Sequence, residues 1–573
     1  MCGIAGFWGE GANERLALEM TDPIRHRGPD GDGWFFDSAA GLALGHRRLS
    51  VIDVSKAGHQ PMTSPCGRFT LTYNGEIYNY AGIRDQLERE GGHFDWQGHS
   101  DTEVLLAALR HWGIRLTLER LNGMFAFALW DSSERQLTLA RDRMGEKPLY
   151  YAASGARFAF GSELKSLRAC PGWAGNVDRT ALTLYLRHNY VPAPYSIFEG
   201  VRKLPPAHFL VVGDQGQTLR LGSYWNLEEA VGGPRISGRS DSEWVDSLHE
   251  LLSDAVNSRM ISDVPLGAFL SGGFDSSTVV ALMQSQATKP VRTFSIGFSE
   301  QEYNEADHAK RVAQHLGTDH TELYVSPNDA LGLIPELPRI WDEPFADSSQ
   351  IPTLLVSQLA RRHVTVALSG DGGDELFGGY GRYSFARRIW HRVGPFPVVA
   401  RRAVGAAMQN APEKTVNALT RAIPERHRPQ HLADRLPKLG ELIAEPTPER
   451  FYRRLISHWR DPSSVVLEGN EPTTIFDRSA QVLPSLPFEE RMMFLDTMTY
   501  LPDDILAKVD RATMSVSLEA RVPLLDHRVV EFAWAAPLHL KMRNGAGKWL
   551  LRQVLYRYVP KELMDRPKMG FGV

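Results

Sequence analysis

The feature that most constrains the fold is a glycine- and serine-rich loop, SGGFDSS at residues 271–277. It follows a predicted strand at Val264–Leu270 and opens a predicted helix from Ser277 through Met283. Glycine allows backbone N–H groups to approach an anion, serine adds hydroxyl donors, and a helix N-terminus adds positive potential. Although a lone Gly-Gly pair is more often a structural turn, this arrangement predicts a phosphate-binding loop. It lacks the Lys that ends a Walker A loop, which disfavours a nucleotide switch or motor.

Composition bounds the fold class and the partners. The chain has 573 residues, enough for several domains, and 43% hydrophobic with 23% charged residues is ordinary for a globular protein. A formal net charge of −4 gives no electrostatic reason to expect nucleic acid or an anionic membrane as a partner. Cys2, Cys66 and Cys170 do not look like a disulfide framework, and we find neither an apolar run of about 18 residues nor a signal peptide. We therefore expect a cytoplasmic protein.

A second chemical signal lies at the N-terminus. Cys2 follows the initiator methionine directly, so removal of Met1 would leave one residue with both a thiol and a free α-amine. Such an amine has an ordinary pKa of about 7.7–8.0 and can act as general base for its own side chain. An isolated Cys2 would more often be a small buried residue in a first strand at Ile4–Trp8. The segments that follow decide between these two interpretations.

Four short segments of the first half each have a local structural explanation. Asn74-Gly75 between two alternating runs predicts a hairpin turn, and Ser100 with Glu103 matches a helix-capping pattern. Arg48 would by default lie on a solvated face. The four segments are HRGPD at 26–30, GHRRLS at 45–50, YNGEIYN at 73–79 and GHSDTE at 98–103.

Together with Cys2, these segments resemble, in order, the N-terminal-nucleophile glutaminase domain of class II glutamine amidotransferases. The resemblance implies an α+β domain with αββα layers at residues 1–212. It implies that Cys2 attacks the side-chain amide of glutamine while Asn74 and the backbone N–H of Gly75 form an oxyanion hole, whose donors typically contribute about 10²–10³ in rate. The residues that would hold the substrate are Arg48 for its α-carboxylate, and Asp101 with Glu76 for its ammonium group.

The second half has the pattern of a parallel sheet. After a predicted linker at residues 213–240, helical and strand periods alternate from Asp241. The last predicted strand ends in an acidic glycine-rich loop, SGDGGDELFGGY at 369–380, and ligands bind beyond the carboxyl ends of such strands. Because Mg²⁺ binds one or two carboxylates plus phosphate oxygens, we predict Asp275 and Asp374 as its ligands. The candidate strands are Val264–Leu270, Val291–Phe298, Thr321–Val325 and Val364–Ser369.

The same half resembles the ATP pyrophosphatase superfamily in its phosphate loop and glutamine-hydrolysing asparagine synthetases in Lys508–Asp526. The resemblance then covers nearly the whole chain and implies an α/β parallel-sheet domain at residues 241–573 with a helical C-terminal part. It implies that Lys568, in RPKMGF at 566–571, neutralises phosphate charge and that Asp371 handles incoming ammonia. The expected ATP-binding residues are Leu270, Ser271, Gly272, Gly273, Asp275, Ser276, Ser277, Ile296, Ser369 and Gly370.

The resemblance implies an ATP- and Mg²⁺-dependent amidotransferase, with asparagine synthesis from aspartate as the first hypothesis. Glutamine hydrolysis would release ammonia into an internal channel, and ammonia would displace AMP from an acyl-adenylate. Two alternatives stay open: the same chemistry on a uronic acid or a secondary metabolite, to which the segment Asp342–Thr353 points, and an inactive regulatory or binding protein. Relatives often form homodimers, and the sequence stops at Val573 where the family usually continues, so we expect a truncation.

Overall fold

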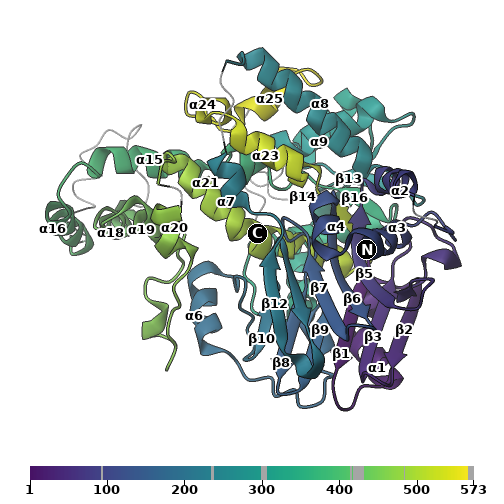
Figure 1. The fold of residues 1–573 in the computed structure, drawn as a ribbon. Coiled ribbons are helices and arrows are strands. Elements are labelled where there is room, and N and C mark those ends of the chain that lie inside the picture. Colours follow the sequence, from purple (N-terminus) through teal and green to yellow (C-terminus); the bar gives the residue numbers. More distant parts are fainter. Residues whose placement is uncertain are drawn as a thin grey trace.

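The computed structural model describes residues 1–91, 94–233, 238–298, 306–412, 414, 416, 432–482 and 484–565. Lys568, which was predicted to meet phosphate, lies outside the described residues. Figure 1 shows two units, with the strands of the first below a second unit that is built from a sheet and many helices. None of the helices in the described ranges is long and apolar enough to cross a membrane.

Two antiparallel sheets form the first unit. The first sheet has the order β10-β8-β9-β1-β3-β2, and the second has the order β12-β11-β7-β6-β5-β4. The strands of the first sheet are β1 (Gly3–Trp8), β2 (Gly31–Asp37), β3 (Leu42–Arg48), β8 (Tyr150–Ser154), β9 (Arg157–Gly161) and β10 (Val201–Lys203). Those of the second are β4 (Met62–Thr63), β5 (Phe69–Ile77), β6 (Gly123–Asp131), β7 (Gln136–Arg141), β11 (His208–Val212) and β12 (Thr218–Ser223).

The two sheets pack face to face because alternate residues of their strands are apolar and point inward. Ile4 and Trp8 of β1 meet Ala126, Ala128 and Trp130 of β6 in this core. Helices cover both outer faces. They are α1 (Glu14–Thr21) and α5 (Leu164–Leu167) on the first sheet, and α2 (Tyr80–Arg89), α3 (Asp101–Trp112) and α4 (Ile114–Arg120) on the second. The αββα prediction is confirmed.

The linker prediction for residues 213–240 is wrong over most of its length. This segment contains β12, which pairs with β11 and extends the second sheet, and the short helix α7 (Leu227–Gly232). Strand β12 lies at the edge of the sheet and is almost wholly exposed, so it carries no buried alternation that sequence reasoning could detect.

The hairpin turn predicted at Asn74-Gly75 is also wrong, because β5 runs straight through both residues. Gly75 lies opposite Phe125 of β6, and a Cβ at this position would lie 2.2 Å from the carbonyl oxygen of Met124. The glycine is therefore required by the close approach of two strands and not by a turn. The capping prediction is confirmed in part, since Ser100 Oγ accepts the N–H of Glu103 at 3.3 Å.

A parallel sheet of order β15-β14-β13-β16-β17 lies at the centre of the second unit. Helices α8 (Asp241–Arg259), α9 (Phe274–Gln286) and α25 (Trp549–Leu555) pack together on one side, and α13 (Gln350–Arg361) covers the other. Four strands were predicted, and the fifth was missed because it is three residues long and carries buried Glu and Arg. The strands are β13 (Leu266–Phe269), β14 (Arg292–Phe298), β15 (Asp319–Val325), β16 (Val366–Leu368) and β17 (Glu519–Arg521).

Candidate active sites

Cys2 directly precedes β1, an inner strand of the first sheet, and is 8% exposed. Its backbone N–H donates to Asn74 Oδ1 at 2.8 Å, and its Sγ lies 3.9 Å from the carbonyl oxygen of Leu49. Burial raises the pKa of the Cys2 thiol, so nucleophilic attack needs a base that removes the proton. Met1 is also buried, and its ammonium pairs with Glu519 of the second unit. The N-terminus therefore lies at the contact between the two units.

Two hydrogen-bond donors accompany Cys2 on β5. Asn74 is fully buried, and its Nδ2 has no hydrogen-bond partner within the described ranges. The N–H groups of Tyr73 and Ile77 donate to side chains on the strand edge that faces away from β6. Backbone N–H groups alternate in direction along a strand, and Gly75 is two residues from both Tyr73 and Ile77. The N–H of Gly75 therefore points to the same edge. The structure thus brings together the nucleophile and both donors that the sequence predicted for an oxyanion.

The predicted glutamine-holding residues lie around this site in different settings. Asp101 begins α3, and its Oδ2 accepts a tyrosine hydroxyl at 2.7 Å and a backbone N–H at 2.9 Å. Glu76 shares a face of β5 with Asn74 and lies 3.5 Å from Arg521 of the second unit. Burial raises the pKa of both carboxyl groups, so an ammonium group placed near them would favour their charged forms. Arg48 donates to two backbone carbonyls of the following loop, one at 2.7 Å.

A buried ion-pair network joins Cys2 to the second unit. The guanidinium of Arg27 donates to the carbonyl oxygen of Cys2 at 3.1 Å and to both carboxylate oxygens of Asp510 at 2.8 and 2.9 Å. Glu163 lies 2.8 Å from Arg27 and 2.9 Å from Arg511. Asp510 and Arg511 belong to α22 (Leu506–Met514) of the second unit. The backbone of Cys2, the predicted nucleophile, is therefore held by an arginine that a helix of the other unit keeps in place.

We expect the substitution Asp510→Asn to lower glutamine hydrolysis by about tenfold, because small displacements of a reacting group cost this much or more. Asparagine keeps the shape of the aspartate side chain but removes the negative charge that holds Arg27 in place. Ammonia-dependent synthesis does not use Cys2, so its loss should be far smaller. Steady-state rates with glutamine and with ammonium chloride measure the two effects. Asp214→Asn is the matched control, since Asp214 forms an exposed pair with Arg135. Equal losses with both nitrogen sources would contradict a role at Cys2.

The second site is a cavity of about 670 Å³ at the carboxyl ends of β13 and β16. The phosphate loop and the acidic loop meet there, which places Asp371 and Asp374 in its lining. Of the predicted ATP-binding residues, only Ser277 does not line the cavity, because it is fully buried within α9. Those that line it are Leu270, Ser271, Gly272, Gly273, Asp275, Ser276, Ile296, Ser369 and Gly370.

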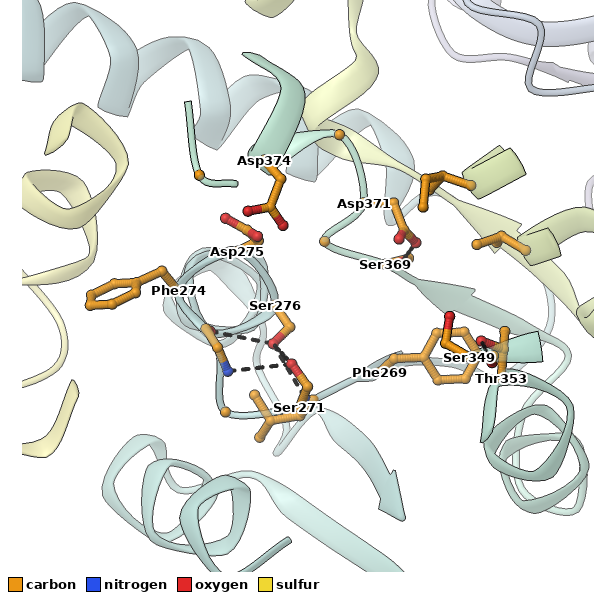
Figure 2. Close-up of a pocket in the computed structure, with 18 of the residues that line it drawn as sticks. Phe269, Ser271, Phe274, Asp275, Ser276, Ser349, Thr353, Ser369, Asp371 and Asp374 are labelled. Carbon is orange, nitrogen blue, oxygen red and sulfur yellow. Dashed lines mark hydrogen bonds between the residues drawn. The ribbon is translucent and has the colours of Figure 1, made fainter. Parts of the chain in front are cut away.

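The phosphate loop has the backbone that its glycines predict. Gly272 has φ +73°, and a Cβ there would lie 2.9 Å from the backbone nitrogen of Ala309. Gly273 caps the N-terminus of α9. The hydroxyl groups of Ser271 and Ser276 lie 3.0 Å apart across the loop, as Figure 2 shows. The loop therefore presents hydroxyl groups and a helix N-terminus to the cavity, which suits an anion.

A lysine that sequence reasoning missed lies between the two predicted magnesium ligands. The ammonium of Lys548 pairs with Asp275 and lies 2.8 Å from Asp374, and the two carboxylates lie side by side in Figure 2. Burial opposes the charged form, but the two carboxylates raise the pKa of Lys548 above its usual range. Gly379 leaves room for this contact, since a Cβ there would lie 2.0 Å from the lysine side chain. The only signal in the sequence is a glycine-rich run, GAGK at 545–548, before a helix.

Comparison with known proteins agrees with this pair of sites. A glutamine amidotransferase domain matches residues 1–225, and asparagine synthase matches residues 247–573. The chain belongs to the asparagine synthase family. Within it, the chain is 35% identical over its whole length to asparagine synthetase (glutamine-hydrolyzing) 1 of Bacillus subtilis, of which it covers 87%.

Two further relatives in the comparison have lower sequence identity to the chain. Asparagine synthetase (glutamine-hydrolyzing) 3 of Bacillus subtilis is 30% identical over all of the chain and 87% of its own length. Amidase chry2 of Gibberella zeae is 27% identical over all of the chain and 88% of its own length. The match therefore extends through both units.

Proposed function

We propose that this chain transfers the amide nitrogen of glutamine to a carboxylate that it first activates with ATP, and that the carboxylate is that of aspartate. The observation that carries the proposal is a buried Cys2 beside Asn74, whose Nδ2 has no hydrogen-bond partner among the described residues. Arg27 joins Cys2 to a second unit that holds a cavity with a phosphate loop. Membership of the asparagine synthase family and relatives named asparagine synthetase support it. An inactive binding protein would have no need to keep both sets of groups in place.

In the first reaction, removal of Met1 makes the α-amine of Cys2 the base for its own thiol. The sulfur attacks the side-chain amide carbon of glutamine, and the negative oxygen that forms accepts hydrogen bonds from Asn74 Nδ2 and the Gly75 N–H. The C–N bond then breaks, and the nitrogen leaves as ammonia with the proton from the amine. Water hydrolyses the resulting thioester and releases glutamate.

In the second reaction, an oxygen of the acceptor carboxylate forms a bond to the α-phosphorus of ATP, and pyrophosphate leaves. This step is needed because a free carboxylate is a poor electrophile. Ammonia then attacks the carbonyl carbon, AMP leaves, and the nitrogen loses a proton. Asp371 suits this last task because burial raises the pKa of its carboxyl group and it lines the cavity.

Asp275 and Asp374 would hold Mg²⁺, and their chemistry fits this ion. Both offer hard carboxylate oxygens, and together they already hold the cationic group of Lys548. Among the described residues, no group of three or more His, Cys, Asp and Glu is arranged for a metal. Phosphate oxygens and water would complete the coordination, as is usual for this ion. When bound, the ion would neutralise phosphate charge.

A buried apolar contact between the two units lies between Cys2 and the cavity. Met1 and Leu49, which adjoin Cys2, pack against Val366 and Met514 of the second unit in one buried apolar cluster. Val366 begins β16, and the same strand ends at the cavity. We propose that ammonia crosses here, because an apolar passage carries it neutral and away from water.

The products of ATP test the proposal directly. With aspartate and ammonium present, we expect AMP and pyrophosphate in equal amounts, because the phosphate loop serves a reaction at the α-phosphorus. Quantitative nucleotide chromatography, with mass spectrometry of the amide, measures this result. Formation of ADP and phosphate would contradict adenylation. Amidation of a uronic acid with no response to aspartate would overturn only the choice of acceptor.

A further inference from the structure

One wall of the ATP cavity carries an oppositely charged pair that the nucleotide chemistry does not explain. The Nζ of Lys508, on α22, lies 2.7 Å from Ser349 Oγ and 3.3 Å from Asp347 Oδ1. All three side chains line the cavity. In Figure 2, Ser349 lies on the opposite side of the cavity from Asp275 and Asp374. The pair is therefore placed away from the predicted metal and phosphate end.

The other cations of the cavity are already committed to that phosphate end. Within the described ranges, the cationic side chains of the lining are Lys508, Lys548 and Arg552. Lys548 pairs with Asp275 and Asp374, and Arg552 lies 4.0 Å from the ring centre of Phe274 in the phosphate loop. Burial raises the pKa of Asp371, whereas the nearby charge of Lys508 lowers it. Lys508 is thus close enough to Asp371 for its charge to act on that carboxyl group, which the proposed function places beside the reacting acyl group.

Asp347 is held in its charged form beside this lysine. Burial opposes the charge, but Lys508, the Ser349 hydroxyl and Asp504 lower the pKa of Asp347. Asp504 belongs to a π-helical turn, Leu501–Ile505, that leads directly into α22. Burial and the charge of Asp347 raise the pKa of Asp504 well above its usual range, which favours the neutral form of Asp504 beside a charged Asp347. The wall thus presents one full positive and one full negative charge.

We infer that Lys508 and Asp347 recognise the headgroup of an α-amino acid acceptor, with Lys508 binding its free carboxylate and Asp347 binding its ammonium. The inference rests on the proposed function and specifies the substrate class. A dicarboxylate keeps one carboxylate after the other is adenylated, and the acidic groups Asp371, Asp374 and Glu375 would repel it without a cation nearby. A uronic acid offers only hydroxyl groups after adenylation, so it would leave this charged pair unused.

Three acceptors separate the two halves of this recognition. Aspartate carries both groups, succinate lacks the ammonium, and 3-aminopropanoate lacks the second carboxylate. We expect the parent enzyme to prefer aspartate over each analogue by about 10²-fold in kcat/KM for pyrophosphate release, as charged recognition groups confer. In Lys508→Gln the preference over 3-aminopropanoate should shrink to within about tenfold. In Asp347→Asn the preference over succinate should shrink in the same way.

Matched variants separate recognition from a general loss of structure. Lys508→Arg keeps the cation and should keep the preference for aspartate. Arg552→Gln removes a cation from the other end of the cavity, so it should raise the KM for ATP and leave the acceptor preferences unchanged. Thermal unfolding checks that each variant is folded, and Asp347→Asn tests the inference independently if Lys508→Gln does not fold.

The failure of this inference and the failure of the proposed function give different results. The parent enzyme could use aspartate while Lys508→Gln and Asp347→Asn keep the parental acceptor preferences. In that case the charged pair does not recognise the acceptor, and the proposed function stands. If the parent enzyme releases no pyrophosphate in response to aspartate and amidates a uronic acid, both the assignment of aspartate as acceptor and this inference are wrong.

Discussion

The substitution Cys2→Ala is expected to reduce glutamine-dependent synthesis by at least about 10³-fold, because loss of a catalytic nucleophile has effects of this size or larger. Synthesis with ammonium chloride should be unchanged, since we propose that the activated acceptor forms independently in the cavity at β13 and β16. Alanine fits the same buried space, which is only 8% exposed, so the fold should persist. Parallel assays of amide formation with the two nitrogen sources measure the contrast.

The control for this experiment is Cys66→Ala, which removes an exposed thiol from the same unit. It should have the activity of the parent enzyme with both nitrogen sources. A folded Cys2→Ala enzyme that uses glutamine at the parental rate would refute the assignment of the nucleophile. Residual activity that disappears on further purification would instead indicate a contaminating glutaminase.

The substitution Asp374→Asn is expected to lower synthesis by at least about 10³-fold with either nitrogen source, on the scale of losses when charged catalytic groups are removed. Asparagine keeps the size of the side chain but leaves Asp275 alone to hold Lys548 or a metal ion. Glutamine hydrolysis should persist, because Cys2 and its donors lie in the other unit. Pyrophosphate release and glutamate formation measure the two activities.

The matched control is Asp246→Asn, since Asp246 pairs with Arg557 on the outside of the same unit. A titration of Asp374→Asn with Mg²⁺ adds a second measurement, because a weakened metal site should shift the requirement to higher concentrations. The assignment would be refuted by a folded Asp374→Asn enzyme that loses both activities equally. Parental pyrophosphate release would refute it as well.

Several parts of the fold could be predicted because they depend on local patterns. The apolar run before residue 271 and the glycines within the loop predict a strand, a tight turn and a helix, and β13, the loop with its positive φ at Gly272, and α9 confirm these three elements. Strand β17 and edge strand β12 could not be predicted in this way. The first is short and contains buried charges, and the second exposes nearly all of its residues. Their sheet positions come from pairing with distant strands.

The candidate sites, like the fold, could be predicted only where they depend on local sequence patterns. The sequence by itself determined which residue types could serve as nucleophile, oxyanion donors and phosphate loop, because those roles belong to short segments. It could not determine that Gly75 lies within a continuous strand, because glycine is needed there for the close approach of the neighbouring strand, where a Cβ would meet the carbonyl oxygen of Met124. Only the tertiary structure placed Lys548 between two aspartates and joined Arg27 to Asp510. Such buried ion pairs join residues far apart in the chain, and no local pattern specifies which charges packing will bring together.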